Sequence, residues 1–117
     1  MPYQSLLDGL VRSVDGAQGA LLLDGLGEVV VEAGDRGERH RLIGAYQGIG
    51  LSRVRRTTER YDIGEILYFL GRYAWGHVIL RPLKDDYYLV ISLAPNANVA
   101  KGLHRSAQTQ ERMNAAL

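Results

Sequence analysis

The chain begins with apolar residues at a helical spacing. They recur three and four residues apart, at Tyr3, Leu6, Leu7, Leu10, Val11 and Val14. This period predicts an amphipathic helix. Asp15-Gly16 follows, and glycine suits the left-handed position after a helix. We therefore expect the first helix to end there.

Two short apolar runs come next, at residues 19–23 and 29–31, with Asp24, Gly25 and Gly27 between them. Turn residues between two such runs predict a β-hairpin. After a polar break we expect a second helix from about residue 39 to residue 58. Its apolar positions cover a wide arc, so this helix needs more than one neighbour. These apolar positions are Leu42, Ile43, Tyr46, Ile49 and Val54.

The pattern changes after Ile63 to three β-rich runs, at residues 65–70, 78–83 and 87–93. The connections between them are short, which predicts an antiparallel meander. Asp85-Asp86 in the second connection is best interpreted as a turn pair. Pro95 ends the last strand, and a final helix follows with Asn98 as its cap. The expected inner face of that helix is Val99, Leu103, Ser106, Gln110, Met113 and Leu117.

These segments predict one domain over residues 1–117, in the order helix-strand-strand-helix-strand-strand-strand-helix. Several runs are apolar at every position, which is typical of strands that are buried on both faces. We therefore expect an α/β fold in the α+β sense. It would be a single five-stranded, mainly antiparallel sheet flanked by helices on both sides.

Composition narrows the function. The 117 residues include no cysteine, which excludes disulfides and thiolate chemistry. The net charge of +1 does not indicate a nucleic-acid partner. No apolar stretch approaches the roughly 18 residues of a membrane span, so no membrane insertion is expected. The first residues show no secretory signal, and we expect the cytoplasm as the location.

Catalytic patterns are weak in this chain. His40, His77 and His104 are isolated, with no ligand-type residue at metal-binding spacing beside them. The serines lack a nucleophile elbow, and Gly25-x-Gly27 lacks the Lys-Ser/Thr of a phosphate loop. We therefore expect no catalytic residue, no metal and no cofactor, and a protein that is not an enzyme.

A stripe of small residues marks the second helix. Gly44, Gly48 and Ser52 recur every four residues and therefore lie on one side of the helix. A glycine inside a helix costs about 1 kcal/mol relative to alanine, so the stripe needs a compensating benefit. Close approach of another helix backbone would supply it. This favours a protein–protein module.

Four residues on one side of the same helix are candidates for binding a partner: Tyr46, Ile49, Arg53 and Arg56. Tyrosine is enriched at interface hot spots. The arginines have two interpretations, which stay open here. They could form a solvated helix end, where cations are favoured, or a docking patch for an acidic partner.

The motifs together resemble the Roadblock family, which includes roadblock-type dynein light chains and bacterial MglB-like regulators of small GTPases. Residues 19–24 (Gly-Ala-Leu-Leu-Leu-Asp), followed by Gly27, look like the first hairpin of that family. The last two strands look like residues 81–83 (Arg-Pro-Leu) and 88–91, with the Asp85-Asp86 turn between them. Residues 96–99 (Asn-Ala-Asn-Val) are similar to the start of the family's third helix. The resemblance covers nearly the whole chain and implies a Roadblock/profilin-like fold.

The resemblance also implies a homodimer in which third strands pair edge to edge and second helices pack together. The sequence supports this separately, because residues 66–70 form an apolar run with no lysine or proline to protect an edge. The predicted dimer interface is Gly44, Gly48, Ser52, Ile66, Tyr68 and Leu70.

The leading hypothesis, which the resemblance implies, is a dimeric, non-enzymatic adaptor that binds a Ras-like small GTPase and could act as a GTPase activator. An arginine finger from Arg53 or Arg56 is the less favoured route to activation, because members of the family can act by ordering the partner's own loops. The first alternative is a pure scaffold for a motor or signalling complex, taking a peptide in its groove or on the free edge of the second strand. The third hypothesis is a small-molecule sensor, which would need a pocket with convergent polar groups.

Overall fold

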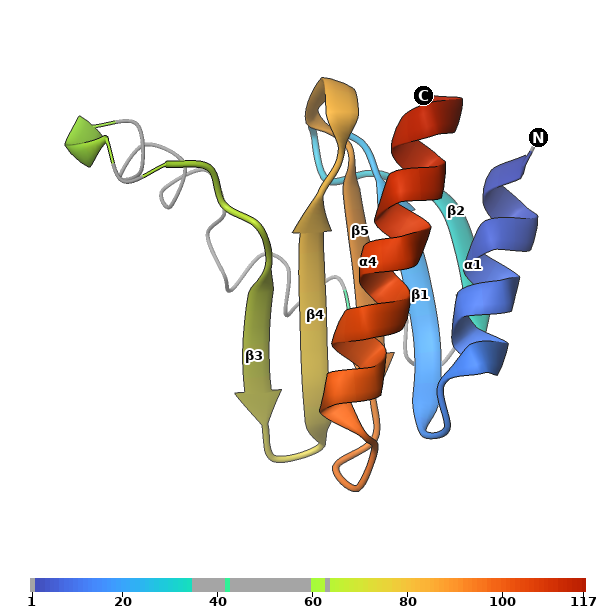
Figure 1. Ribbon diagram of the computed structural model, residues 1–117. Coiled ribbons are helices and arrows are strands. Elements are labelled where there is room, and N and C mark those ends of the chain that lie inside the picture. Colours follow the sequence, from blue (N-terminus) through green and yellow to red (C-terminus); the bar gives the residue numbers. More distant parts are fainter. Residues whose placement is uncertain (1, 35–41, 43–59, 63) are drawn as a thin grey trace.

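The computed structural model describes residues 2–34, 42, 60–62 and 64–117 (Figure 1). These residues form two long helices and five strands, with one short 3-10 turn. In chain order the elements are α1 (Pro2–Ser13), β1 (Ala17–Leu23), β2 (Val29–Gly34), β3 (Phe69–Tyr73), β4 (Gly76–Pro82), η2 (Lys84–Asp86), β5 (Tyr88–Leu93) and α4 (Val99–Ala116).

The five strands form one antiparallel sheet in the order β2-β1-β5-β4-β3. The helices α1 and α4 lie side by side across the same face of this sheet (Figure 1). Helix α1 covers β1 and β2, and α4 covers β4 and β5. The predicted fold class and the order of these elements are confirmed, and β2 and β3 form the two edges of the sheet.

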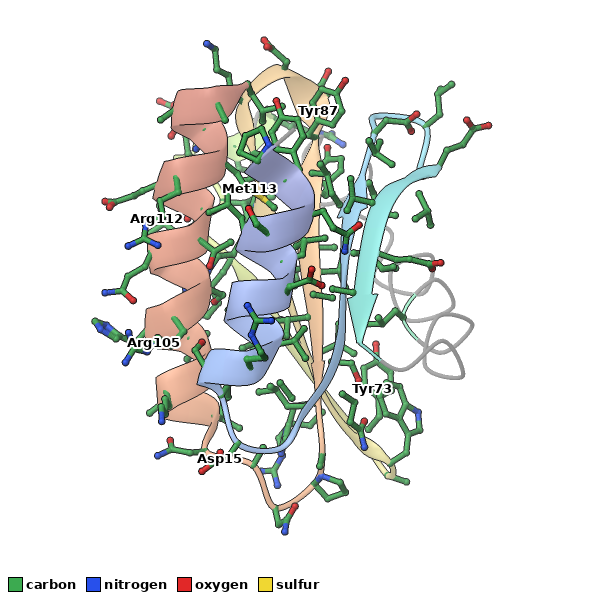
Figure 2. All side chains as sticks on the ribbon, turned by 90° about the vertical axis from the view of Figure 1, so that its right-hand side faces the viewer. Asp15, Tyr73, Tyr87, Arg105, Arg112 and Met113 are labelled. Carbon is green, nitrogen blue, oxygen red and sulfur yellow. The ribbon has the colours of Figure 1, made fainter. Side chains whose placement is uncertain are left out.

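Alternate side chains of the central strands enter two separate cores, as the period of a strand requires. The core under the helices contains Leu89 and Ile91 of β5 together with Leu7, Leu10 and Met113. Figure 2 shows Met113 between the helices and the sheet, whereas Arg105 and Arg112 of α4 extend outward.

The opposite face of the sheet carries the second core, which includes Leu21, Val78, Leu80 and Val90. Leu42 packs into it and is 1% exposed. Leu42 is also the one described residue of the second predicted helix, whose other positions lie outside the described residues. Both faces of the central strands are therefore buried, in agreement with their continuous apolar sequence.

The final helix begins as the sequence predicts. The side chain of Asn98 accepts a hydrogen bond from the backbone N–H of Lys101 at 3.1 Å, which satisfies one of the free donors at a helix N-terminus. Gly102 lets this helix approach the sheet closely, because a Cβ there would lie 2.8 Å from Cδ1 of Leu93. Among the described helices, none is long and apolar enough to cross a membrane.

The turn before β5 also agrees with the sequence. Asp85 and Asp86 adopt positive φ angles of 59° and 62°, a region that aspartate tolerates better than most residues. Gly76 in the β3–β4 hairpin also has a positive φ, of 147°. A Cβ at Gly76 would collide with the carbonyl oxygen of Leu93.

One predicted strand is displaced. The apolar run at 65–70 predicts a strand there, but β3 runs from Phe69 to Tyr73, and residues 64–68 have no regular structure. The tight turn at Ala74-Trp75 determines this outcome, because it places Tyr73 opposite Gly76 and Phe69 opposite Leu80. The strand therefore includes Gly71, Arg72 and Tyr73, which lie beyond the end of the predicted run. Ile66 and Tyr68 lie before the strand instead of inside it.

Candidate functional site

The outer edge of β3, with the residue that precedes it, presents apolar surface to solvent. We call residues 68–73 the β3 edge. Tyr68 is 44% exposed, Leu70 39% and Tyr73 37%. Three large side chains with this exposure on one short segment are a candidate protein-interaction site, because exposed apolar patches mark such sites.

No described strand pairs with the outer side of β3. Tyr73 and Gly76 flank the two-residue turn and therefore form a pair that exchanges both hydrogen bonds. Such pairs alternate along the ladder, so Leu70 and Arg72 direct their N–H and C=O groups away from β4. A further strand can bind to these groups.

The side chains of the β3 edge lie on both faces of the sheet. Leu70 is opposite Ile79, whose side chain enters the core under the helices. Tyr73 lies on the other face, away from α1 and α4 (Figure 2). Its ring stacks on Trp75, with the ring centroids 5.2 Å apart and the planes 11° from parallel.

Three of the predicted dimer-interface residues are described. Leu70 lies in β3, Tyr68 lies directly before it, and Ile66 is half-buried and packs against the second core. The other predicted site residues lie outside the described residues: Gly44, Gly48 and Ser52 for the dimer, and Tyr46, Ile49, Arg53 and Arg56 for the partner. Their roles stay predictions.

A second feature is a buried arginine on β4. Arg81 is 6% exposed, and its Nε donates a hydrogen bond to Oγ of Ser106 at 2.8 Å. Its Nη2 donates to the carbonyl oxygen of Leu103 at 2.8 Å, and its Nη1 lies 3.5 Å from Oε1 of Gln110. Burial lowers the pKa of this guanidinium from its ordinary value, and the nearby Tyr68 acts in the opposite direction.

Sequence reasoning assigned no role to Arg81 beyond its place in a family-like motif. An available signal was its position in a strand. Side chains alternate between the two faces of a strand, so Arg81 lies on the same face of β4 as His77 and Ile79, and Leu80 lies on the other face. A charged residue on a strand face that packs into a core is unusual. This position alone singles out Arg81 as a candidate functional residue.

A groove lies beside Arg81. It has a volume of about 960 Å³ and lies between residues 62 and 64–68, the end of β4 and the C-terminal half of α4. Its apolar lining includes Ile66, Leu67 and Pro82. The groove thus combines an apolar wall with a buried cation.

Histidine chemistry is sparse in the described part of the chain. His77 is 7% exposed in β4, with Nε2 3.3 Å from the carbonyl oxygen of Pro95, and its Nδ1 has no hydrogen-bond partner. His104 is exposed on α4. Within the described ranges, no group of three or more histidine, aspartate or glutamate side chains is arranged to hold a metal ion.

Comparison with known proteins identifies the fold. No family model matches the sequence, and no curated protein matches it. Solved structures do match. A Roadblock/LC7 domain from Streptomyces avermitilis is 19% identical, with 97% of this chain and 95% of that one covered and a TM-score of 0.82. MglB from Myxococcus xanthus is 13% identical, with 99% and 94% covered and a TM-score of 0.84.

MglC from Myxococcus xanthus is also similar, with 21% identity, a TM-score of 0.70 and full coverage of both chains. The chain therefore has the Roadblock/LC7 fold, and the resemblance stated from the sequence is confirmed at the level of the fold. At these identities the comparisons establish architecture only.

Proposed function

We propose that this chain is a dimeric, non-enzymatic adaptor that binds a Ras-like small GTPase. The observation that carries the proposal is the β3 edge, an exposed apolar strand edge at the end of a sheet with the Roadblock/LC7 fold. An edge of this kind invites aggregation unless a partner covers it.

In the proposed dimer, β3 pairs with β3 of a second copy and the two sheets become continuous. The outward N–H and C=O groups of Leu70 and Arg72 form the new ladder. Tyr68 and Leu70 then bury apolar surface against the second copy, which stabilises the pair by about 25 cal/mol for each Å² removed from water. The small-residue stripe of Gly44, Gly48 and Ser52 is proposed to pack against the same stripe of the second copy. Self-association also occurs among proteins with this fold, since one solved MglB structure is described as having a tetrameric arrangement.

The GTPase part of the proposal comes from the resemblance to MglB-like regulators. The partner is proposed to lie across the paired second helices, in contact with Tyr46, Ile49, Arg53 and Arg56. Activation of hydrolysis is the finer proposal. The dimer would hold the partner's switch segments in an arrangement competent for hydrolysis, since positioning and electrostatics supply most of the catalysis in phosphoryl transfer.

The test has two stages. Sedimentation of the purified chain should show a dimer, and a monomer at all concentrations would contradict the first half of the proposal. Affinity capture from the native lysate, run in parallel with GDP and with a non-hydrolysable GTP analogue, addresses the second half. Selective recovery of a small GTPase with the analogue supports it. Recovery of a partner in equal amounts with GDP and with the analogue, or recovery of no GTPase, would favour the scaffold alternative.

Gly48→Leu is the variant for both stages. A leucine in the stripe should wedge the paired helices apart, and both the dimer and the captured partner should be lost. A Gly48→Leu protein that is still a dimer with normal capture would contradict the role proposed for the stripe. Gly9→Leu is the control, because a Cβ at this glycine of α1 meets nothing within 4 Å.

A further inference from the structure

Arg81 is held by α4 through uncharged groups. Its described acceptors are the hydroxyl of Ser106, the carbonyl of Leu103 and the distant amide oxygen of Gln110. The ring of Tyr68 lies over the guanidinium, 5.0 Å from its central carbon to the ring centroid. These contacts fix the position of the guanidinium but do not neutralise its charge.

No carboxylate among the described residues contacts Arg81, which is unusual for an arginine buried to this degree. Buried charges are generally paired with an opposite charge. A guanidinium has five N–H donors in a planar fork, and the described acceptors take one from Nε, one from Nη2 and, at long range, one from Nη1. At least two N–H groups therefore have no acceptor among the described protein groups.

Arg81 lines the groove defined above. Gln110 and Asn114 of α4 line the groove beside Arg81, and Ile66, Leu67 and Pro82 supply apolar contacts. Lys84 adds a second cation at the rim. A carboxylate that enters here meets a fixed donor fork, which matches its geometry better than a mobile lysine would.

We propose that this groove binds a protein partner through an aspartate or glutamate side chain that pairs with Arg81, with the partner's neighbouring apolar residues against Ile66, Leu67 and Pro82. Charge complementarity selects this occupant. The site lies on the α4 face of the sheet, whereas Leu42 packs into the core on the opposite face. The site shares Ile66 and Tyr68 with the predicted dimer interface, and it does not involve the nucleotide.

The groove also contains acidic residues, and their position decides whether they oppose the proposal. Asp62, Glu65 and Asp86 line it, but all three are exposed. Water and salt screen exposed charges strongly, whereas Arg81 is buried and interacts at a lower effective dielectric constant. The buried cation therefore dominates at the base of the groove, and the acidic rim disfavours partners with several acidic residues in a row.

The test uses two capped peptides, acetyl-Leu-Glu-Leu-amide and acetyl-Leu-Gln-Leu-amide, titrated into the ¹⁵N-labelled full chain. We expect the glutamate peptide to shift the Nε–H resonance of Arg81 and to bind about tenfold more tightly than the glutamine peptide. In Arg81→Gln this preference should disappear. Equal binding of the two peptides, absence of binding, or a preference that survives in Arg81→Gln would overturn the proposal.

A second variant covers the case in which Arg81→Gln fails to fold after losing its contacts with α4. Gln110→Glu places a carboxylate beside Arg81 from within the chain and should abolish the preference for the glutamate peptide. Gln110→Leu is its matched control. Both changes remove the hydrogen bond from Nε2 of Gln110 to the carbonyl of Pro82 at 2.7 Å, but only the first supplies a charge. Retention of the preference in Gln110→Glu would contradict the site.

Discussion

The two edges of the sheet differ in how they are protected. At β2, the side chain of Gln4 in α1 donates a hydrogen bond to the backbone carbonyl of Glu32 at 2.9 Å. The pairing with β1 is also irregular there, because Leu22 is opposite Val31 and Leu23 is opposite Val29. Val30 is therefore an extra residue in a bulge. Bulges and occupied backbone groups are both recognised ways to protect an edge strand.

The β3 edge shows neither device. All five residues of β3 pair with β4 in an unbroken register. No side chain in the described part of the chain forms a hydrogen bond to the backbone of β3. Of the charged residues and prolines that often protect edges, β3 contains Arg72 but no lysine or proline. Among the described residues, the β2 edge is therefore the better protected of the two and the β3 edge the less protected.

This difference gives the sheet a direction for assembly. A second copy can extend the sheet at β3, whereas β2 is a poor place to add a strand. The scaffold alternative in which a peptide binds the free edge of the second strand therefore loses support. Three substitutions test the comparison.

The largest effect is expected where the β3 hairpin turns. Gly76→Ala places a Cβ against the carbonyl oxygen of Leu93 at a φ of 147°, and it should lower the free energy of unfolding by about 3 kcal/mol. Urea unfolding measures this. Gly71→Ala is the control, because its Cβ meets only the movable ring of Tyr73, at 2.8 Å. A Gly76→Ala protein as stable as Gly71→Ala would show that the turn does not determine the position of β3.

An intermediate effect is expected on self-association. Leu70→Lys should raise the dissociation constant of the proposed dimer about tenfold or more, because it removes apolar contact area and places a charge at the edge. Sedimentation equilibrium measures the constant. Val30→Lys on β2 is the matched control, since Val30 is 45% exposed and Leu70 is 39% exposed. If both variants weaken the dimer equally, the two edges do not differ in function.

The smallest effect concerns the protected edge. Gln4→Leu removes the donor to the carbonyl of Glu32 and should lower the free energy of unfolding by about 1 kcal/mol. Thermal and urea unfolding measure the change. Gln108→Leu is the control, since Gln108 is also exposed but only accepts a hydrogen bond from Arg105 within α4, at 3.2 Å. A loss no larger than that of the control would mean that Gln4 does not hold this edge.

Much of the fold could be predicted because the relevant signals are local. The period of residues 3–14 predicts α1, Asn98 predicts the start of α4, and Asp85-Asp86 predicts a turn whose positive φ angles aspartate tolerates. Apolar residues at every position of the central strands predict burial on both faces. Each of these features depends on a few neighbouring residues, and contacts between distant segments do not change it.

The site was less predictable because its parts come from distant segments. The apolar run at 65–70 satisfies the pattern of a strand, but pairing with β4 through a two-residue turn selected residues 69–73 instead. The partner of Glu32 is Gln4, and the surroundings of Arg81 come from α4, more than twenty residues further along the chain. No local window contains these pairs.

The sequence by itself therefore determined the order of helices and strands, the caps and turns, and the central strands of the sheet, because local conformational preference and hydrophobic period decide these. Tertiary structure alone decided the register of β3, the unequal protection of the two sheet edges and the charged groove at Arg81. Those features arise from hydrogen bonds and packing between segments far apart in the chain, and such contacts exist only once the chain has folded.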